Sequence, residues 1–242
     1  MSGLAYQRAR RVEDRPWLLA PEHDYGRFTV AGCEFWQVFA ALRDVDRSIN
    51  GTGSGCNVTA PWDATALGVC RCSTGTTTTG RAGFQTNTSA MLLGGAEYVF
   101  SSRIRLFSGL SDGTNTYTLY SGIADSTSAE PTDGVYFRYS HSVGNWELVQ
   151  RDNGSEIATD TGIAVANQTP YVLRIEVAAD ASSCVGYVNG TKIVPATFGL
   201  PTSSGRNTGI VPVNIRKSAG TTSREVDIDY FALTARFLSD VR

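Results

Sequence analysis

The 242-residue sequence contains no long apolar run, and no segment approaches the roughly 20 apolar residues that a membrane-spanning helix needs. Its N-terminal residues also lack the apolar core of a secretory signal peptide. Cysteine is scarce: five residues, an odd number, are scattered along the chain, unlike the framework of a disulfide-stapled secreted domain. We therefore expect a protein that is made in a cytoplasm and enters no membrane.

An excess of charge of one sign is lacking too. The 21 basic and 23 acidic residues give a net charge of −2, so there is no basic field to hold a nucleic acid. The two histidines, His23 and His141, are not accompanied by a G-x-S-x-G motif, and the glycine-rich stretches lack the lysine of a phosphate-binding loop. The sequence thus argues against nucleic-acid binding, serine hydrolase chemistry and nucleotide binding.

Few residues suggest a metal or a cofactor. In LGVCRCSTG, the strand period places Cys70 and Cys72 on one face, which indicates small buried side chains. A metal site is the alternative, but no second Cys or His pair lies nearby. Four residues in loops have the oxygen ligands that calcium prefers, although ordinary turns explain them: Asp112, Asn115, Asp125 and Asp133. We predict no metal and no cofactor.

From about residue 52 onward, the sequence consists of short alternating runs separated by turn residues. In AEYVFSSRIRLF, Tyr98, Phe100 and Ile104 share one face while Arg103 and Arg105 share the other. YVLRIEV and REVDIDYFAL alternate in the same way, and Asp-Asn-Gly and Asn-Gly sequences supply hairpin turns. One dry and one wet face per strand is typical of antiparallel sheets. The sequence therefore predicts an all-β fold, an antiparallel two-sheet β-sandwich.

Composition divides the chain into four parts. Residues 1–24 are predicted to form an extended arm that docks on a partner, residues 52–237 the sandwich, and residues 238–242 a C-terminal tail. In the intervening residues 25–51, apolar side chains follow helical spacing, which indicates a short helix, with a bulged strand as the alternative. These apolar residues are Phe35, Val38, Phe39 and Leu42. The predicted docking residues of the arm are Arg8, Arg10, Arg11, Arg15 and Trp17.

Several segments, including CRCSTGTTTTGRAGF, GIADSTSAEPTDGVYFRY and NWELVQRDNG, resemble a concanavalin A-like or laminin-G-like jelly roll found in structural proteins of tailed bacteriophages and related particles. The resemblance runs over roughly residues 66–235. It implies a non-enzymatic virion protein, such as a head fibre, tail fibre or decoration subunit, assembled in the bacterial cytoplasm. It also implies a homotrimer, contact of the arm with other virion proteins, and contact of the sandwich with host glycans.

One segment, EVDID, resembles the E-x-D-x-E motif of retaining endoglucanases built on the same sandwich. Glu225, Asp227 and Asp229 alternate along a strand and so share a face, as carboxylate-based glycoside hydrolysis requires. However, the last acid has a shorter side chain, and the segment lies closer to the C-terminus than in those enzymes. The solvated outer face of a terminal strand explains the acids equally well. We predict no catalytic residues and no enzyme, with a carbohydrate-binding module or a glycoside hydrolase as the alternative function.

Aromatic residues are concentrated in EPTDGVYFRYSHSVGNWELVQRDNGSE, residues 130–156. The alternation assigns most of them to the core, but it places Tyr136 on the opposite face of its strand. Trp146 lies next to a turn, at a possible edge of the sheet. The same count leaves Tyr120 and Tyr187 on the outer faces of other strands. We predict these four as exposed residues that stack on sugar rings; cross-strand packing is the alternative interpretation.

Overall fold

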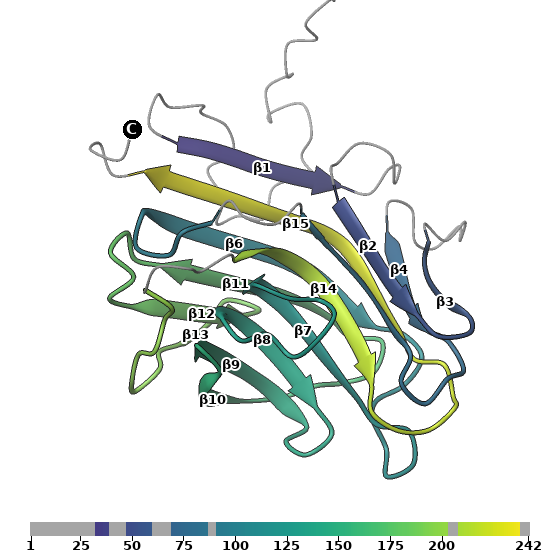
Figure 1. Ribbon diagram of the computed structural model, residues 1–242. Coiled ribbons are helices and arrows are strands. Elements are labelled where there is room, and N and C mark those ends of the chain that lie inside the picture. The colour runs from purple at the N-terminus through teal and green to yellow at the C-terminus, as the bar shows by residue number, and fades with distance from the viewer. Residues whose placement is uncertain (1–31, 39–46, 60–68, 87–90, 203–207, 238–242) are drawn as a thin grey trace, which may run out of the picture.

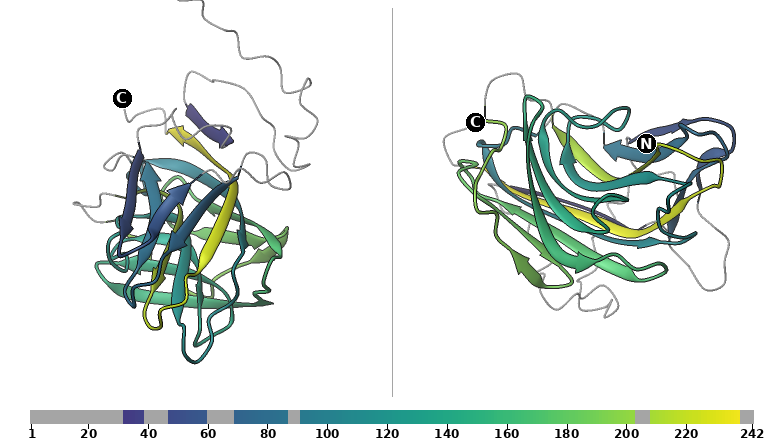
Figure 2. Two further views of the ribbon diagram at one scale, coloured as in Figure 1. Left: turned by 90° about the vertical axis from the view of Figure 1, so that its right-hand side faces the viewer. Right: turned by 90° about the horizontal axis from the view of Figure 1, so that it is seen from below.

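The computed structural model describes residues 32–38, 47–59, 69–86, 91–202 and 208–237. In these residues, 15 strands form two antiparallel sheets that curve and stack face to face (Figure 1; Figure 2). The predicted all-β, two-sheet sandwich is confirmed. None of the described residues forms a helix, and so none forms a helix that could cross a membrane.

One sheet has eight strands. Seven of them follow one another in space as β13 (Thr191–Ile193), β12 (Cys184–Val188), β11 (Pro170–Val177), β6 (Ala96–Leu106), β15 (Glu225–Phe237), β4 (Cys70–Thr74) and β3 (Cys56–Thr59). The eighth strand, β1 (Gly32–Val38), pairs with β15 beyond the end of β4.

The other sheet has seven strands. Their order in space is β10 (Ser155–Ala164), β9 (Asn145–Asp152), β8 (Gly134–Ser140), β7 (Tyr117–Ala124), β14 (Gly209–Lys217), β5 (Arg81–Thr86) and β2 (Arg47–Thr52). Three of its six neighbouring pairs are consecutive in the chain: β7–β8, β8–β9 and β9–β10. The turn between β9 and β10 has left-handed backbone at Asn153 (φ 49°) and Gly154 (φ 82°), which confirms the hairpin turn predicted there.

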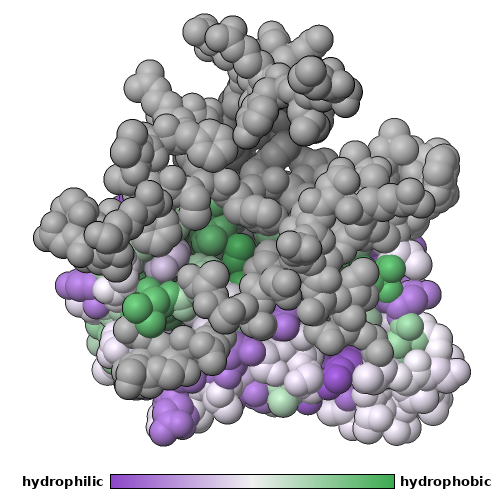
Figure 3. Space-filling view, turned by 45° about the horizontal axis from the view of Figure 1, so that its top comes forward, coloured by the Kyte–Doolittle hydropathy of each residue, from purple (hydrophilic) through white to green (hydrophobic). Residues whose placement is uncertain are grey.

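The core lies between the two sheets and follows the alternation of the strands. In β11, Tyr171, Leu173 and Ile175 are buried in the core, while Arg174 and Glu176 lie on the outer face and are partly exposed. Large apolar side chains are exposed at few described positions, and on the face shown in Figure 3 the visible apolar groups of the described residues form only small patches. The sandwich therefore buries its apolar side chains mainly between its own sheets.

The helix predicted in residues 25–51 is wrong for the part that the structure describes. Gly32–Val38 is strand β1, and it pairs with Tyr230–Arg236 of β15. The reason is that β4 covers only Glu225–Ile228 on that edge of β15, so backbone groups further along the strand need a partner. The strand β2, Arg47–Thr52, similarly completes the seven-stranded sheet, so the sandwich begins before residue 52.

Several predictions on the termini concern residues outside the described ones. These are the arm of residues 1–24, the tail of residues 238–242 and the helical positions Phe39 and Leu42. The predicted docking residues Arg8, Arg10, Arg11, Arg15 and Trp17 lie in the same undescribed segment.

A chain of hydrogen bonds crosses the core between the two sheets. Ser121 of β7 donates its hydroxyl hydrogen to the carbonyl oxygen of Pro212 (2.6 Å), and the Ser102 hydroxyl of β6 lies 2.9 Å from the Ser121 oxygen. Pro212 lies in a bulge of β14, between the paired residues Val211 and Asn214. Both serines are fully buried. Ser121 therefore satisfies a carbonyl group that the irregular pairing of β14 leaves available.

We expect Ser121→Ala to lower the free energy of unfolding by about 1–3 kcal/mol, because it leaves the buried Pro212 carbonyl and the Ser102 hydroxyl without their partner. The matched control is Ser101→Ala, since the Ser101 hydroxyl is equally buried but has no hydrogen-bond partner among the described residues. Urea unfolding of both variants measures the difference. Equal stability of the two variants would contradict a stabilising role for the Ser121 bond.

Candidate binding face of the seven-stranded sheet

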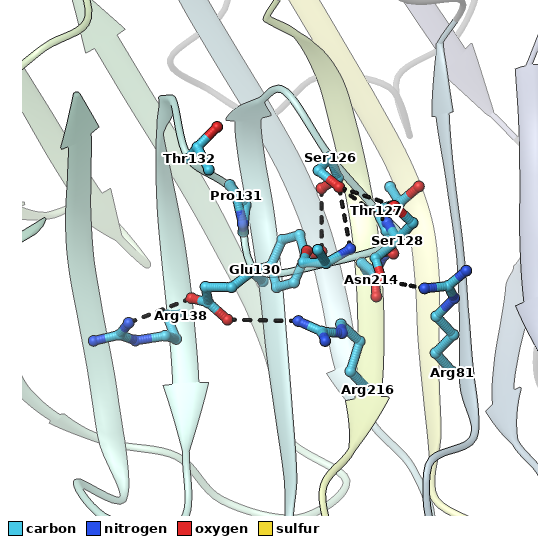
Figure 4. Close-up of polar contacts among 12 residues, drawn as sticks. Arg81, Ser126, Thr127, Ser128, Glu130, Pro131, Thr132, Arg138, Asn214 and Arg216 are labelled. Carbon is cyan, nitrogen blue, oxygen red and sulfur yellow. Dashed lines mark hydrogen bonds and ion pairs between the residues drawn. The ribbon is translucent and has the colours of Figure 1, made fainter. Parts of the chain in front are cut away.

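The loop between β7 and β8, residues 125–133, folds back across the outer face of the seven-stranded sheet (Figure 4). Its sequence, DSTSAEPTD, favours tight turns closed by side chains. The Ser126 hydroxyl accepts hydrogen bonds from the amides of Ser128 and Ala129, each at 3.1 Å. The Asp125 carboxylate accepts the Thr132 amide at 3.0 Å and also the Thr132 hydroxyl. The loop is thus ordered by its own polar side chains.

Side chains of the sheet bind the backbone of this loop. The Asn214 side-chain amide of β14 donates to the Thr127 carbonyl (2.6 Å), and Arg81 of β5 donates to the Ser128 carbonyl. From β7, the Tyr120 hydroxyl lies 3.0 Å from the Ala129 carbonyl and 3.1 Å from the Ser126 carbonyl. On the other side, Arg151 of β9 donates to the Pro131 carbonyl (2.7 Å). Strands on both sides of β7 therefore hold the loop against the sheet.

An apolar cluster lies on this outer face. Its members are at most 1% exposed: Tyr120, Ala124, Tyr136, Val149 and Val211. The rings of Tyr120 and Tyr136 contact each other with centroids 5.5 Å apart. Burial raises the pKa of both tyrosine hydroxyls well above the ordinary value. The outer face therefore has an aromatic floor that does not reach solvent.

A network of charges borders the floor. Arg138 of β8 donates from Nε to Glu147 (3.0 Å) and from its two terminal nitrogens to Glu156 (2.9 and 2.8 Å). Arg151 also donates to Glu156 (2.9 Å). The hydrogen bonds from Arg138 are the main reason that the pKa of Glu156 lies below its usual value. Two arginines and two glutamates thus balance one another here.

Glu130 connects the loop to this network. Its carboxylate lies 3.5 Å from Arg138 Nη1 and 3.7 Å from Arg216 Nη1 of β14, and it accepts the Tyr136 hydroxyl at 3.3 Å. In Figure 4 the Glu130 side chain lies between the two arginines. All three distances are longer than those that Arg138 makes to Glu156. Glu130 is therefore the loosely bound member of the network.

The structure buries three of the four predicted sugar-stacking residues. Tyr120 and Tyr136 lie on the outer face of one sheet, as predicted, but both are fully buried beneath the loop. Trp146 is fully buried in the core, because its face of β9 is the one that meets the other sheet. The predicted exposure of these three residues is wrong.

Tyr187 lies apart from the other three residues. It belongs to β12 of the eight-stranded sheet, on the outer face, and is partly exposed. Its ring lies 5.4 Å from the Arg174 guanidinium, and its hydroxyl donates to Glu176 (3.2 Å). The structure therefore does not bring the four predicted residues together into one site.

The three acids of EVDID lie on the outer face of the eight-stranded sheet, as predicted, and each is paired with an arginine. Asp227 accepts hydrogen bonds from Arg71 (2.7 and 3.0 Å) and Arg105 (2.6 Å), and its side chain is 3% exposed. Asp229 forms an ion pair with Arg103, and Glu225 lies 3.9 Å from Arg71. Asp227 is thus held in a buried structural ion pair, whereas Asp229 and Glu225 form more exposed contacts.

The candidate calcium ligands make turns. The Asp112 carboxylate accepts hydrogen bonds from the backbone amides of Asn115 (2.6 Å) and Thr114 (2.8 Å). These bonds lower the pKa of Asp112, and the bond from Asn115 has the largest effect. Arg224 donates to the same carboxylate (2.6 Å). Asp125 and Asp133 face the backbone of the β7–β8 loop and of the β9–β10 turn. Within the described ranges, no three His, Cys, Asp or Glu side chains gather where they could hold a metal ion.

The predicted burial of the cysteine pair is confirmed. Cys70 and Cys72 are both fully buried on the core face of β4. The hydrogen bond between them, together with burial, raises the pKa of Cys72 well above the ordinary value. Both side chains are therefore part of the packing of the core.

Sequence reasoning did not identify Glu130, Arg216 or Arg81 as members of a common site. Arg216 follows Glu130 by 86 positions and belongs to a strand on the far side of β7, so no local pattern connects them. The useful signal is the loop itself, since DSTSAEPTD is longer than a hairpin between β7 and β8 requires.

Comparison with known proteins places this fold in a family. Residues 65–229 match the family model described as SO2946-like, C-terminal domain. A solved protein of unknown function, SO2946 from Shewanella oneidensis MR-1, is similar over 88% of this chain and 90% of its own, with a TM-score of 0.67 and 12% identity. No curated protein matches the sequence.

Two further solved structures share the jelly-roll sandwich. An endo-1,3-β-glucanase from Streptomyces sioyaensis is similar over 88% of this chain and 100% of its own (TM-score 0.56, 9% identity). Peanut lectin is similar over 86% of this chain and 99% of its own (TM-score 0.54, 10% identity). At such low identity the likeness concerns the fold alone, and that fold occurs both in a hydrolase and in a lectin.

We expect Tyr120→Phe to loosen the β7–β8 loop, because it removes the hydroxyl group of β7 that donates a hydrogen bond to the carbonyl groups of Ser126 and Ala129. The expected loss is about 1 kcal/mol of local stability, the size of one hydrogen bond. Amide hydrogen exchange in residues 125–133 measures it. Tyr187→Phe, which removes a partly exposed hydroxyl from the other sheet, is the matched control and leaves this exchange unchanged. Equal exchange in both variants would show that Tyr120 does not hold the loop.

Proposed function

The chain belongs to the SO2946-like family through its C-terminal domain, and we propose a non-catalytic role for it. In this proposal it is a structural protein of a bacteriophage or phage-like particle, such as a head fibre, tail fibre or decoration subunit. The sandwich is displayed on the particle surface and contacts host glycans. Assembly occurs in the cytoplasm of the bacterial host.

The observation that carries the non-catalytic part is the pairing of the EVDID carboxylates. Retaining glycosidases use two carboxyl groups about 5–5.5 Å apart, one as a free nucleophile and the other as a proton donor. Here Asp227 accepts three hydrogen bonds from two arginines and is almost entirely buried. A carboxylate held in this way reaches neither a sugar ring nor a water molecule, so Asp227 serves neither as a nucleophile nor as a proton donor.

The particle part of the proposal concerns the N-terminal segment. Strand β1 belongs to the eight-stranded sheet, and the predicted arm precedes this strand in the chain. We propose that the arm of this chain binds another virion protein, with Arg8, Arg10 and Arg11 among the residues that make the contact. A closed homotrimer is the proposed assembly, since rotational symmetry covers exposed sheet edges.

A stand-alone carbohydrate-binding module is the second candidate function. Its support is the fold shared with peanut lectin, together with the partly exposed Arg216 on the outer face of the seven-stranded sheet. The two candidates differ in whether the arm is needed: a particle subunit requires it, and a stand-alone module does not.

We expect the wild-type chain to release no reducing ends from soluble β-1,3- and β-1,3-1,4-glucans beyond the level seen without protein. The variant Glu225→Gln is the comparison, since the Glu225 side chain has only a long contact with Arg71 and we expect its replacement to preserve the fold. Hydrolysis by the wild type that Glu225→Gln abolishes would overturn the non-catalytic assignment.

We expect a chain that begins at Gly26 to fold like the full chain but to be absent from particles. It keeps β1 and therefore the pairing of β15, while it loses the arm. Circular dichroism with thermal melting checks the fold, and immunoblotting of particles purified from a producing host checks incorporation. A full-length chain with Arg8, Arg10, Arg11 and Arg15 changed to Ala tests the charges alone. Normal incorporation of the chain that begins at Gly26 refutes the docking role.

A further inference from the structure

The outer face of the seven-stranded sheet contains two arginines on opposite sides of one strand. Arg138 of β8 lies opposite Tyr120 of β7, and Arg216 of β14 lies opposite Thr118 of β7. With about 4.8 Å between neighbouring strands, the two backbones are about 10 Å apart. Long arginine side chains that converge over β7 can therefore hold one carboxylate between them, and Glu130 is held there (Figure 4).

We propose that Arg138, Arg216 and the Tyr136 hydroxyl form a binding site for the carboxylate of an acidic sugar, and that Glu130 occupies this site in the free protein. The three groups are one guanidinium on each side and a hydroxyl donor, which suit a carboxylate with two oxygens. The inference rests on the proposed contact with glycans, and it specifies which glycans are bound: polysaccharides that contain uronic acids.

The contacts of Glu130 are those of an exchangeable group. Its oxygens lie 3.3, 3.5 and 3.7 Å from the three donors, whereas charged hydrogen bonds in good geometry measure about 2.7–2.9 Å. The Glu130 side chain is 34% exposed and that of Arg216 is 30% exposed, so a ligand can reach both from solvent. A carboxylate that approaches from outside can therefore make shorter bonds than Glu130 does.

Exchange does not require the loop to open. The backbone of the loop is bound through the carbonyl groups of Thr127, Ser128, Ala129 and Pro131, and none of these bonds involves the Glu130 side chain. The side chain can rotate into solvent while the loop keeps the rings of Tyr120 and Tyr136 buried, and its departure opens the Tyr136 hydroxyl, which it covers, to the ligand. The ligand then binds at the border of the loop, above the aromatic floor.

The charge balance of the site favours an anion once Glu130 has left it. Arg138 and Arg151 are compensated by Glu147 and Glu156, which they bind at 2.8–3.0 Å. Glu130 is the ion-pair partner of Arg216 among the described residues. Rotation of Glu130 therefore leaves Arg216 uncompensated beside the bound network, and an incoming carboxylate restores the balance.

The test compares binding of polygalacturonate with binding of its fully methyl-esterified form, by calorimetry on the full chain. Glu130→Gln keeps the shape of the side chain and removes its charge; we expect it to bind polygalacturonate about two- to fivefold more tightly than the wild type, the size expected of an exposed ion pair. The esterified polymer should not bind. Arg216→Gln should lose the binding in both the wild-type and the Glu130→Gln background.

The matched control is Glu97→Gln, which removes the same charge from a Glu–Arg pair of the same length, 3.7 Å, on the other sheet. If Glu97→Gln tightens binding as much as Glu130→Gln does, the effect is one of net charge and the inference is wrong. Equal binding of the two polymers would overturn the carboxylate site while leaving the proposed glycan contact standing. Absence of binding to either polymer, and to a panel of neutral and acidic host polysaccharides, would overturn both.

Two further measurements keep the result interpretable. Thermal melting of each variant shows whether it is folded, and Arg216 is chosen over Arg138 because Arg138 also holds Glu147 and Glu156. Monomeric galacturonate and acetate separate recognition of a sugar from recognition of any carboxylate. Equal affinity for acetate and galacturonate would refute the assignment to an acidic sugar.

Discussion

The hydrogen-bonding requirement of strand β15 determines how much of the chain takes part in the sandwich. A strand inside a sheet must have a partner for the backbone groups on both of its edges. Along one edge, β15 pairs with β6 from Val226 to Phe237. Along the other edge, β4 supplies partners only up to Ile228, and β1 supplies those from Tyr230 onward. The N-terminal strand is therefore recruited by an edge that would otherwise stay open, and a bulge at Asp229 marks the change of partner.

This constraint explains which parts of the fold could be predicted from the sequence. Alternation is a local property, so the strand at 170–177 and its two faces could be read directly. The pairing of β1 could not, because Phe35 and Val38 fit a helical period, and the reason for a strand there lies about 200 residues away in β15. Where local periodicity and a distant open edge disagree, the edge determines the structure.

The same distinction applies to the candidate site. Alternation assigned Tyr120 and Tyr136 to the correct face, because the facing of a side chain depends on its own strand. Their burial depends on the β7–β8 loop, whose bonds to Asn214 and Arg81 join positions 87 and 47 residues apart. The partners of Asp227 show the same limit, since Arg71 is 156 residues distant. Facing can be predicted from the sequence, whereas exposure and charge pairing require the tertiary contacts.

The two outer faces of the sandwich contain similar residues but use them differently. On the eight-stranded sheet, Asp227 is bonded at 2.6–3.0 Å and its side chain is 3% exposed, so removing either arginine would leave a buried charge with only one of its two partners. On the seven-stranded sheet, Glu130 is 34% exposed and bonded at 3.3–3.7 Å, so water can solvate it as soon as it moves. Exposure therefore separates an ion pair that maintains the fold from one that can be exchanged for a ligand, although both consist of a carboxylate between two arginines.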